Sequence, residues 1–343
     1  MTTAGIILPG GGMQGVSQAG NLSALLPALK RNRIDLSYLG GTSVGGIQGA
    51  KISEGMTIDE CISIQSETIQ TWLAIERHGP EIIFPLTSVK FAWGLYSGAI
   101  LDGTTLWGLV NGKLLGTSGI DPLKIMAAPR QFDLVVKNSL TFSSEVLSIQ
   151  DQKFQKNPNE ILNAIVAAAS LPPFFPSQKV FETPYEDGRF IAPLVKRAIK
   201  AGCNFIFVLF PYQRRKMDRP TDWFSRSFPE IIKPLLRITA MSNEIDEAEI
   251  ERAKAVAQDI RAQEKARNFF STPWGKRKFD RAINKAGFTF ARKRDLVICE
   301  VYIENKPSSL LVHTFDKKNK DLSLVLDSSE NTMSKLLREM QLY

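Results

Sequence analysis

Two units of strand, glycine-rich turn and helix lie within the first 55 residues and constrain the fold more than any other feature. Residues 4–8 form an apolar run that ends at Pro9 and three glycines, and apolar residues at helical spacing follow as far as residue 29. Residues 36–39 predict a second short strand, and a helix over residues 47–52 follows another glycine-rich turn. Such repetition is typical of a parallel α/β sheet. We therefore expect helices to cover a mostly parallel central sheet.

The rest of the chain continues this pattern and changes character after residue 221. Apolar runs and helical spacing predict strands at residues 132–136, 205–210 and 296–303, and helices at residues 57–76, 159–170, 195–201 and 331–340. Residues 79–120 are irregular and rich in glycine and aromatics, which indicates an insertion or cap, and residues 229–266 predict long charged helices. We expect residues 1–215 to form the core, and residues 216–343 to form a helical, basic extension whose final strand and helix complete the same domain.

The net charge of +8 favours anionic partners, such as nucleic acid or an anionic lipid surface. The first residues lack the basic region of a signal peptide, and no apolar stretch reaches the 18 residues of a transmembrane helix. The three cysteines are far apart and include no C-x-x-C pair, so they suggest neither a disulfide framework nor a zinc site. This cysteine usage fits a reducing compartment.

The first glycine-rich segment, GGGMQG at residues 10–15, fits the pattern G-x-G-x-x-G. A strand precedes it, a helix follows it, and Asp35 lies about 20 residues further on, as in dinucleotide-binding folds. A glycine-rich turn between strand and helix serves other functions as well. Dinucleotide binding is therefore one hypothesis for this loop.

The second segment, GTSVG at residues 41–45, fits G-x-S-x-G, in which a sharp turn presents a nucleophilic serine. The simpler alternative is that Ser43 is a helix N-cap, since serine is favoured at that position. The two segments support each other, because acyl transfer needs a nucleophile and nearby backbone N–H donors for the oxyanion. Dinucleotide binding would leave the serine turn without a purpose.

With these segments in view, the chain resembles the patatin-like phospholipases, a family of serine acyl hydrolases. Four segments carry the resemblance in the family's order: GGGMQG at 10–15, GTSVG at 41–45, AAASLPPFFPS at 167–177, and Asp187-Gly188. A weaker match at residues 94–110 resembles a segment that leads to a cap helix near the substrate groove. The resemblance spans roughly residues 4–212.

The resemblance implies a three-layer α/β/α sandwich and a Ser–Asp catalytic dyad. Ser43 would attack the acyl carbonyl, and Asp187 would accept its proton and later activate water. Gly10, Gly11, Gly12 and Met13 would supply the oxyanion hole, with Gly15, Gly41, Gly45 and Gly188 as supporting motif glycines. The chain departs from the family at Gln14, where a basic residue is usual, and at Arg189, where a second glycine often follows. Gln14 need not abolish activity, because the oxyanion donors would be main-chain N–H groups.

A catalytic triad is the alternative to this dyad. Ser43, Asp187 and His313 follow the order of α/β hydrolases, and His313 comes after an apolar strand. Ser43 nevertheless comes very early in the chain, and no triad-like segment surrounds His313. His78 is expected at the end of a helix, so we interpret both histidines as structural.

Residues 267–294 carry nine basic residues and one acid, interleaved with phenylalanine and tryptophan. This composition suits an anionic bilayer surface, and a solvated charged face over buried aromatics is the simpler explanation. No recognisable nucleic-acid module accompanies it, so nucleic acid is not expected as a partner.

We thus expect a metal-independent lipid acyl hydrolase of the phospholipase A type, without a cofactor, in the cytoplasm and peripheral on membranes. The alternatives are a general or neutral-lipid esterase, an idle patatin-like domain that binds lipid or a partner, and a dinucleotide-dependent oxidoreductase. The sequence leaves open an activator or partner protein and the oligomeric state.

Overall fold

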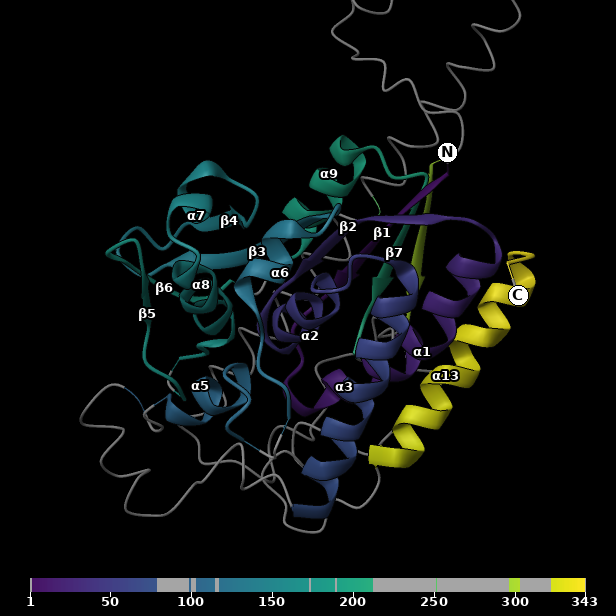
Figure 1. The fold of residues 1–343 in the computed structure, drawn as a ribbon, viewed down its shortest axis with the longest axis horizontal. Helices are drawn as coiled ribbons and strands as arrows, with labels where there is room; N and C mark the ends of the chain where they lie inside the picture. Colours follow the sequence, from purple (N-terminus) through teal and green to yellow (C-terminus); the bar gives the residue numbers. More distant parts are fainter. Residues whose placement is uncertain are drawn as a thin grey trace, which may run out of the picture.

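The computed structural model describes residues 2–78, 99, 103–114, 117–172, 174–188, 190–211, 251, 296–302 and 322–342. In this part of the chain, eight strands form one mixed, mostly parallel sheet in the order β5-β6-β3-β2-β1-β7-β8, with β4 paired to β3 (Figure 1). The parallel strands are β1 (Thr3–Leu8), β2 (Asp35–Gly41), β3 (Gln131–Asn138), β7 (Phe205–Leu209) and β8 (Val297–Val301). The antiparallel strands are β4 (Ser144–Ser148), β5 (Gln178–Val180) and β6 (Thr183–Asp187).

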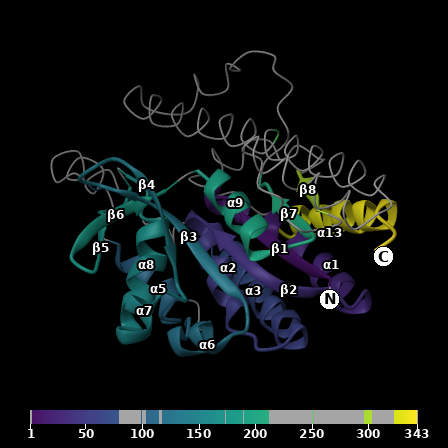
Figure 2. The ribbon, with the colours of Figure 1, turned by 90° about the horizontal axis from the view of Figure 1, so that it is seen from above.

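Helices cover both faces of the sheet, which gives the expected three layers. The helices are α1 (Gly15–Arg31), α2 (Ser43–Ser53), α3 (Ile58–His78), α5 (Thr104–Val110), α6 (Pro122–Ala127), α7 (Gln152–Lys156), α8 (Asn159–Ala169), α9 (Ala192–Ala201) and α13 (Leu322–Glu339), with a 3-10 turn at Gly12–Gln14. Figure 2 shows α9 on one side of the sheet and α2, α3 and α8 on the other. The sandwich is therefore three layers deep around the central strands.

Each central strand contributes side chains to two apolar cores, one on each face of the sheet. In β3, Phe132, Leu134 and Val136 belong to the core beneath α1, α2 and α8, whereas Val135 belongs to the core beneath α9. Alternate residues of a strand point to opposite faces, so a sheet buried on both sides needs apolar residues at successive positions. This explains why the predicted strands appear as continuous apolar runs in the sequence.

Helix α13 packs along α1, although the two are far apart in the sequence (Figure 1). The helices approach closely at Gly20, where an added Cβ would lie 2.2 Å from the Leu326 carbonyl oxygen. Helix α13 thus completes the helical layer that contains α1, the helix that begins at the first glycine-rich segment.

The predicted strands and helices are confirmed wherever the structure describes them, but three helices begin earlier than predicted. Helix α2 begins at Ser43 rather than at residue 47, and α9 begins at Ala192 rather than at residue 195. Helix α13 begins at Leu322 rather than at residue 331. The predictions for residues 229–266 and 267–294 lie outside the described residues. Among the helices that are described, none has the length and apolarity needed to cross a bilayer.

Candidate active site

Ser43 stands at a sharp turn between β2 and α2. β2 ends at Gly41, Thr42 is extended, and Ser43 begins α2 with a positive φ of 54°. This conformation is uncommon for a residue other than glycine, and such strained residues concentrate at functional sites. A Cβ at Gly45 would lie 2.1 Å from the Leu8 carbonyl oxygen, so the turn has no room for a side chain there. The geometry is that of a nucleophile elbow.

The glycine loop, residues 10–15, follows β1 and lies against this elbow. A Cβ at Gly10 would lie 2.7 Å from the Cβ of Ser43, so the loop can approach the serine this closely only with glycine at this position. Gly12 and Met13 line the same pocket as Ser43. The other predicted glycines lie as follows: Gly11 against Pro211, Gly15 at the start of α1, and Gly188 after β6 against Val135.

Asp187 ends β6 and is 3% exposed. It pairs with Val136 of β3 in antiparallel register, and its N–H donates to the Ser170 carbonyl at 3.0 Å. Its Oδ1 lies 3.1 Å from the hydroxyl oxygen of Thr42, the residue before Ser43. The structure therefore brings the elbow, the glycine loop and Asp187 together.

Thr42 is a residue of this site that the sequence analysis missed. Its hydroxyl is fully buried and also lies 3.2 Å from the Val135 carbonyl oxygen. The position is a variable one in the G-x-S-x-G pattern, so the motif alone did not identify it. A buried hydroxyl needs a partner, and the carboxylate is one that the motif could not reveal.

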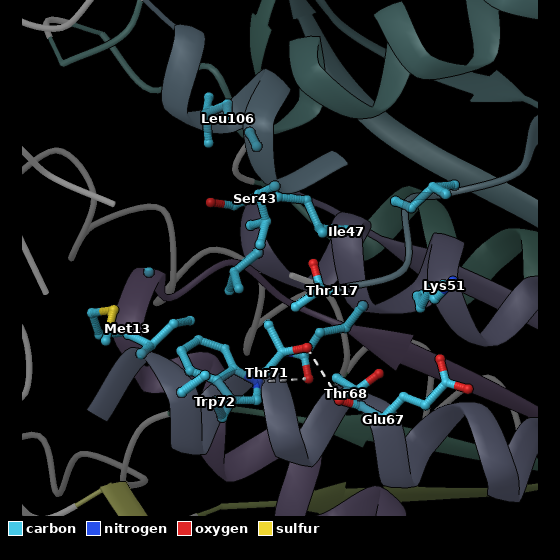
Figure 3. A pocket seen from close by; sticks show the side chains of 18 of the residues that line it. Met13, Ser43, Ile47, Lys51, Glu67, Thr68, Thr71, Trp72, Leu106 and Thr117 are labelled. Carbon is cyan, nitrogen blue, oxygen red and sulfur yellow. Dashed lines mark hydrogen bonds between the residues drawn. The ribbon is translucent and has the colours of Figure 1, made fainter. Parts of the chain in front are cut away.

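A pocket of about 590 Å³ opens at Ser43 and runs between α2, α3 and α5. Figure 3 shows Met13 and Trp72 at one end of it and Lys51 and Glu67 at the other. The apolar part of its wall includes Ile47, Trp72, Leu106, Leu109, Phe174 and Phe175. Mostly apolar walls with few polar groups are typical of sites for small ligands and lipid chains.

Two of the family-like segments contribute to this wall. Leu106 and Leu109 lie on α5, within residues 94–110, and Phe174 and Phe175 lie within residues 167–177. Only residues 99 and 103–110 of the first segment are described. The described part of this weak match thus lines the pocket.

The far end of the pocket is anchored by an ion pair. Lys51 Nζ lies 2.9 Å from Glu54 Oε2 and 2.9 Å from the Gly119 carbonyl oxygen, and the other Glu54 oxygen accepts from the Asp121 N–H at 3.0 Å. Burial raises the pKa of the Glu54 carboxyl, while the hydrogen bond from Lys51 acts in the opposite direction. These contacts hold the segment at residues 117–121 against α2.

The remaining candidates of the sequence analysis are placed elsewhere or not described. Asp35 begins β2 beside Thr3, at the end of the parallel strands opposite to the glycine loop, where it cannot act as the acidic residue of a dinucleotide site. His78 is exposed at the end of α3. His313 and Arg189 lie outside the described residues.

Comparisons with known proteins add a family and a set of similar folds. A model of the patatin-like phospholipase family matches residues 6–195, more than half of the 343-residue chain. The structure is similar to VipD from Legionella pneumophila, at 13% identity, covering 98% of this chain and 67% of that chain, with a TM-score of 0.42. It is also similar to ExoU–SpcU from the type III secretion system of Pseudomonas aeruginosa, at 13% identity, 99% and 76% coverage and a TM-score of 0.27. No curated protein sequence matches the chain.

Proposed function

The chain belongs to the patatin-like phospholipase family, and we propose that it hydrolyses carboxylic ester bonds of phospholipids through a Ser43–Asp187 dyad. The family consists of lipid acyl hydrolases. The observation that carries the proposal is the contact between the elbow and Asp187, in which the Thr42 hydroxyl lies 3.1 Å from the carboxylate. A buried carboxylate in contact with the residue before a strained serine can serve as the adjacent base that activates such a nucleophile.

In the proposed reaction, the Ser43 hydroxyl attacks the ester carbonyl while its proton passes to Asp187. The oxyanion binds N–H groups of the glycine loop, from Gly10, Gly11, Gly12 and Met13. Collapse of the tetrahedral intermediate breaks the ester bond, and the leaving alkoxide takes the proton from Asp187. Asp187 then accepts a proton from water as the water oxygen attacks the acyl-serine carbonyl. When the bond between Ser43 Oγ and the acyl carbon breaks, Asp187 returns this proton to Ser43 and the fatty acid is released.

Thr42 supports these proton transfers. Its hydroxyl has a single proton and lies within hydrogen-bond distance of two acceptors, the Asp187 carboxylate and the Val135 carbonyl. When Asp187 is ionised, Thr42 can donate to it. When Asp187 carries the proton from Ser43, Asp187 can donate to Thr42, and Thr42 can donate to the Val135 carbonyl. Thr42 and Asp187 therefore remain hydrogen-bonded in both protonation states of the base.

The pocket supports a lipid substrate. Its apolar wall begins at Ser43 and continues along α2 through Ile47, which suits an acyl chain whose carbonyl lies at the serine. The charge of +8 favours an anionic lipid surface. We therefore propose phospholipids in a bilayer as the substrate, with phospholipase A chemistry.

The test uses the full chain, a fluorophosphonate probe and vesicles of defined phosphatidylcholine and phosphatidylglycerol. We expect the probe to label the wild type and not Ser43→Ala. We expect Asp187→Asn to lower turnover by about 10²- to 10⁴-fold, the range for loss of a general base. Fatty acid and lysophospholipid should appear in equal amounts.

Three outcomes would contradict the proposal in different ways. Absence of labelling with vesicles present would favour an idle lipid-binding or partner-binding domain. Loss of activity in His313→Ala would favour a triad. Turnover of soluble esters without any phospholipid product would favour a general esterase.

A further inference from the structure

Beneath the glycine loop, three buried side chains form a chain of hydrogen bonds that we call the amide chain: Gln18, Gln48 and Trp72. The Trp72 indole N–H donates to Gln48 Oε1 at 3.5 Å, and Gln48 Nε2 donates to Gln18 Oε1 at 3.1 Å. Gln18 Nε2 then donates to the carbonyl oxygens of Pro9 at 2.7 Å and Leu209 at 3.0 Å. The three side chains are 0%, 3% and 5% exposed, so water does not compete for these bonds.

The two ends of the amide chain determine its direction. An indole N–H can only donate, and a backbone carbonyl can only accept. Trp72 therefore requires the oxygen of Gln48 on its side, which turns the Gln48 nitrogen toward Gln18 and the Gln18 nitrogen toward the loop. If either amide were reversed, it would place donor against donor or acceptor against acceptor at its contacts.

The end of the amide chain acts on one peptide unit of the glycine loop. The Pro9 carbonyl and the Gly10 N–H belong to the same planar trans peptide, so they point in opposite directions. Gln18 holds this carbonyl, and in doing so it fixes the direction of the Gly10 N–H. Gly10 is the loop residue whose Cα approaches Ser43 too closely for a side chain.

A second bond of the amide chain fastens the other end of the loop. Gln48 Nε2 donates to the Gly15 carbonyl at 3.0 Å, while the Gln14 N–H donates to the Gly11 carbonyl at 3.0 Å within the loop. Gln48 lies on α2, the helix that Ser43 begins. One side chain thus ties the glycine loop to the helix that carries the nucleophile.

We infer that Gln18, oriented by Gln48 and Trp72, is a positioning residue that directs the Gly10 N–H toward the oxyanion formed at Ser43. The inference rests on the proposed function. Gln18 touches neither substrate nor reacting atoms, and it acts only through the Pro9 peptide.

The chain offers a matched control in Gln65. This glutamine is 2% exposed, and its Nε2 donates at 2.8 Å to the Ala19 carbonyl of α1, not to the glycine loop. Its Oε1 has no hydrogen-bond partner among the described residues. Gln65→Leu and Gln18→Leu both remove a buried amide that holds a backbone carbonyl, but only Gln18→Leu releases the loop.

The experiment measures the full-length wild type, Gln18→Leu, Gln65→Leu and Trp72→Phe with a soluble p-nitrophenyl ester and the fluorophosphonate probe. Loss of one oxyanion donor costs about 10²- to 10³-fold in kcat, so misdirection of a donor by Gln18→Leu should cost about 10- to 100-fold. KM should change little. Gln65→Leu, which breaks one hydrogen bond rather than three, should lose less stability in urea and keep the wild-type kcat. Trp72→Phe, which keeps an aromatic side chain but loses the five-membered ring with its N–H, should lower kcat by about threefold to tenfold and leave KM unchanged.

Equal kcat in Gln18→Leu and Gln65→Leu, per folded molecule, would overturn the inference. If Gln18→Leu does not fold, Trp72→Phe decides: an unchanged kcat overturns the inference, and a lowered kcat with unchanged stability and unchanged KM supports it. A wild type that reacts with neither ester nor probe would refute the proposed function, and this inference with it. If the wild type is active and Gln18→Leu has the same kcat as the wild type, only this inference is refuted, and the proposed function stands.

Discussion

Two buried polar groups lie on opposite faces of the same sheet, and they are built differently. The amide chain lies under the glycine loop, whereas a carboxylate cluster of Tyr38, Asp133 and Arg197 lies on the α9 face. Asp133 is fully buried and accepts from the Tyr38 hydroxyl at 3.1 Å and from Gln131 Nε2 at 2.9 Å. Arg197 Nε lies 3.8 Å away, and Asp133 Oδ1 has no hydrogen-bond partner in the described part of the chain.

The difference between the groups lies in what each one determines. Neutral amides with fixed ends can be satisfied in only one orientation, so they set the direction of a peptide. The carboxylate cluster has a buried charge with incomplete pairing, so it affects mainly the free energy of folding. Burial, and after it the charge of Asp133, raises the pKa of Tyr38 far above its ordinary value and keeps that phenol a donor. We therefore expect the amide chain to affect catalysis and the carboxylate cluster to affect stability.

The largest expected effect comes from Asp133→Ala. The variant leaves the buried Tyr38 hydroxyl without its acceptor and removes the charge opposite Arg197, so the free energy of unfolding should fall by about 3 kcal/mol. Urea unfolding measures this change. The probe should label the folded fraction at the wild-type rate, and slower labelling would break the distinction between the two groups.

Thr42→Val tests whether a second neutral donor beside the elbow also acts on catalysis. The variant keeps the shape of the side chain and removes the hydroxyl, and we expect about a tenfold lower kcat, the effect of roughly 1.4 kcal/mol. Because the Asp187 carboxylate loses a donor, the acidic limb of the pH–rate profile should move to higher pH. Thr42→Ser should keep both quantities at their wild-type values, and an unchanged kcat and pH–rate profile in Thr42→Val would exclude Thr42 from the proposed proton transfers.

A smaller effect is expected from Tyr38→Phe. One hydrogen bond to Asp133 is lost, so the free energy of unfolding should fall by about 1 kcal/mol, again with unchanged labelling. A double-mutant cycle of Tyr38→Phe with Asp133→Ala should show that the two losses are not additive, since they share one contact. Additive losses would mean that the bond contributes nothing.

The smallest effect is expected from Glu54→Gln. Glu54 is a buried carboxyl like Asp133 but lies on the pocket face, so this variant tests whether a buried carboxyl affects stability on that face as well. Burial raises the pKa of Glu54 in the folded protein, so folding takes up a proton in the pH range just above the ordinary value of 4.5. Stability should therefore fall as pH rises through this range in the wild type, and the fall should be weaker in Glu54→Gln. Urea midpoints at several pH values measure the difference, and identical slopes would contradict it.

The sequence predicted those parts of the fold that local patterns specify. The apolar runs and glycine turns located β1, β2, β3 and β7, because strands buried on both faces need continuous apolar residues. The first nine residues of α13 were missed, since Asp327 and two following serines favour turns in isolation. Packing against α1 overrides this local preference.

For the site, motifs indicated Ser43, the glycine loop and Asp187, and the structure brings these segments together. Their catalytic roles stay predictions. Thr42, Gln18 and Gln48 could not be predicted in the same way, because the role of a buried polar side chain depends on which backbone group it faces. That partner is set by long-range packing: Gln18 bonds a carbonyl 191 positions away, at Leu209.

The packing of α13 on α1 has a consequence for the time at which activity can arise. Residues 322–339 leave the ribosome long after the segments that carry the serine and the glycine loop. Until then, the face of α1 that α13 covers has no partner, and α1 also carries Gln18. Contacts between such distant segments form late in folding. A nascent chain would thus already contain the proposed nucleophile while α1, the helix that carries Gln18, still lacks its packing partner, so the proposed activity would arise only once synthesis has passed residue 339.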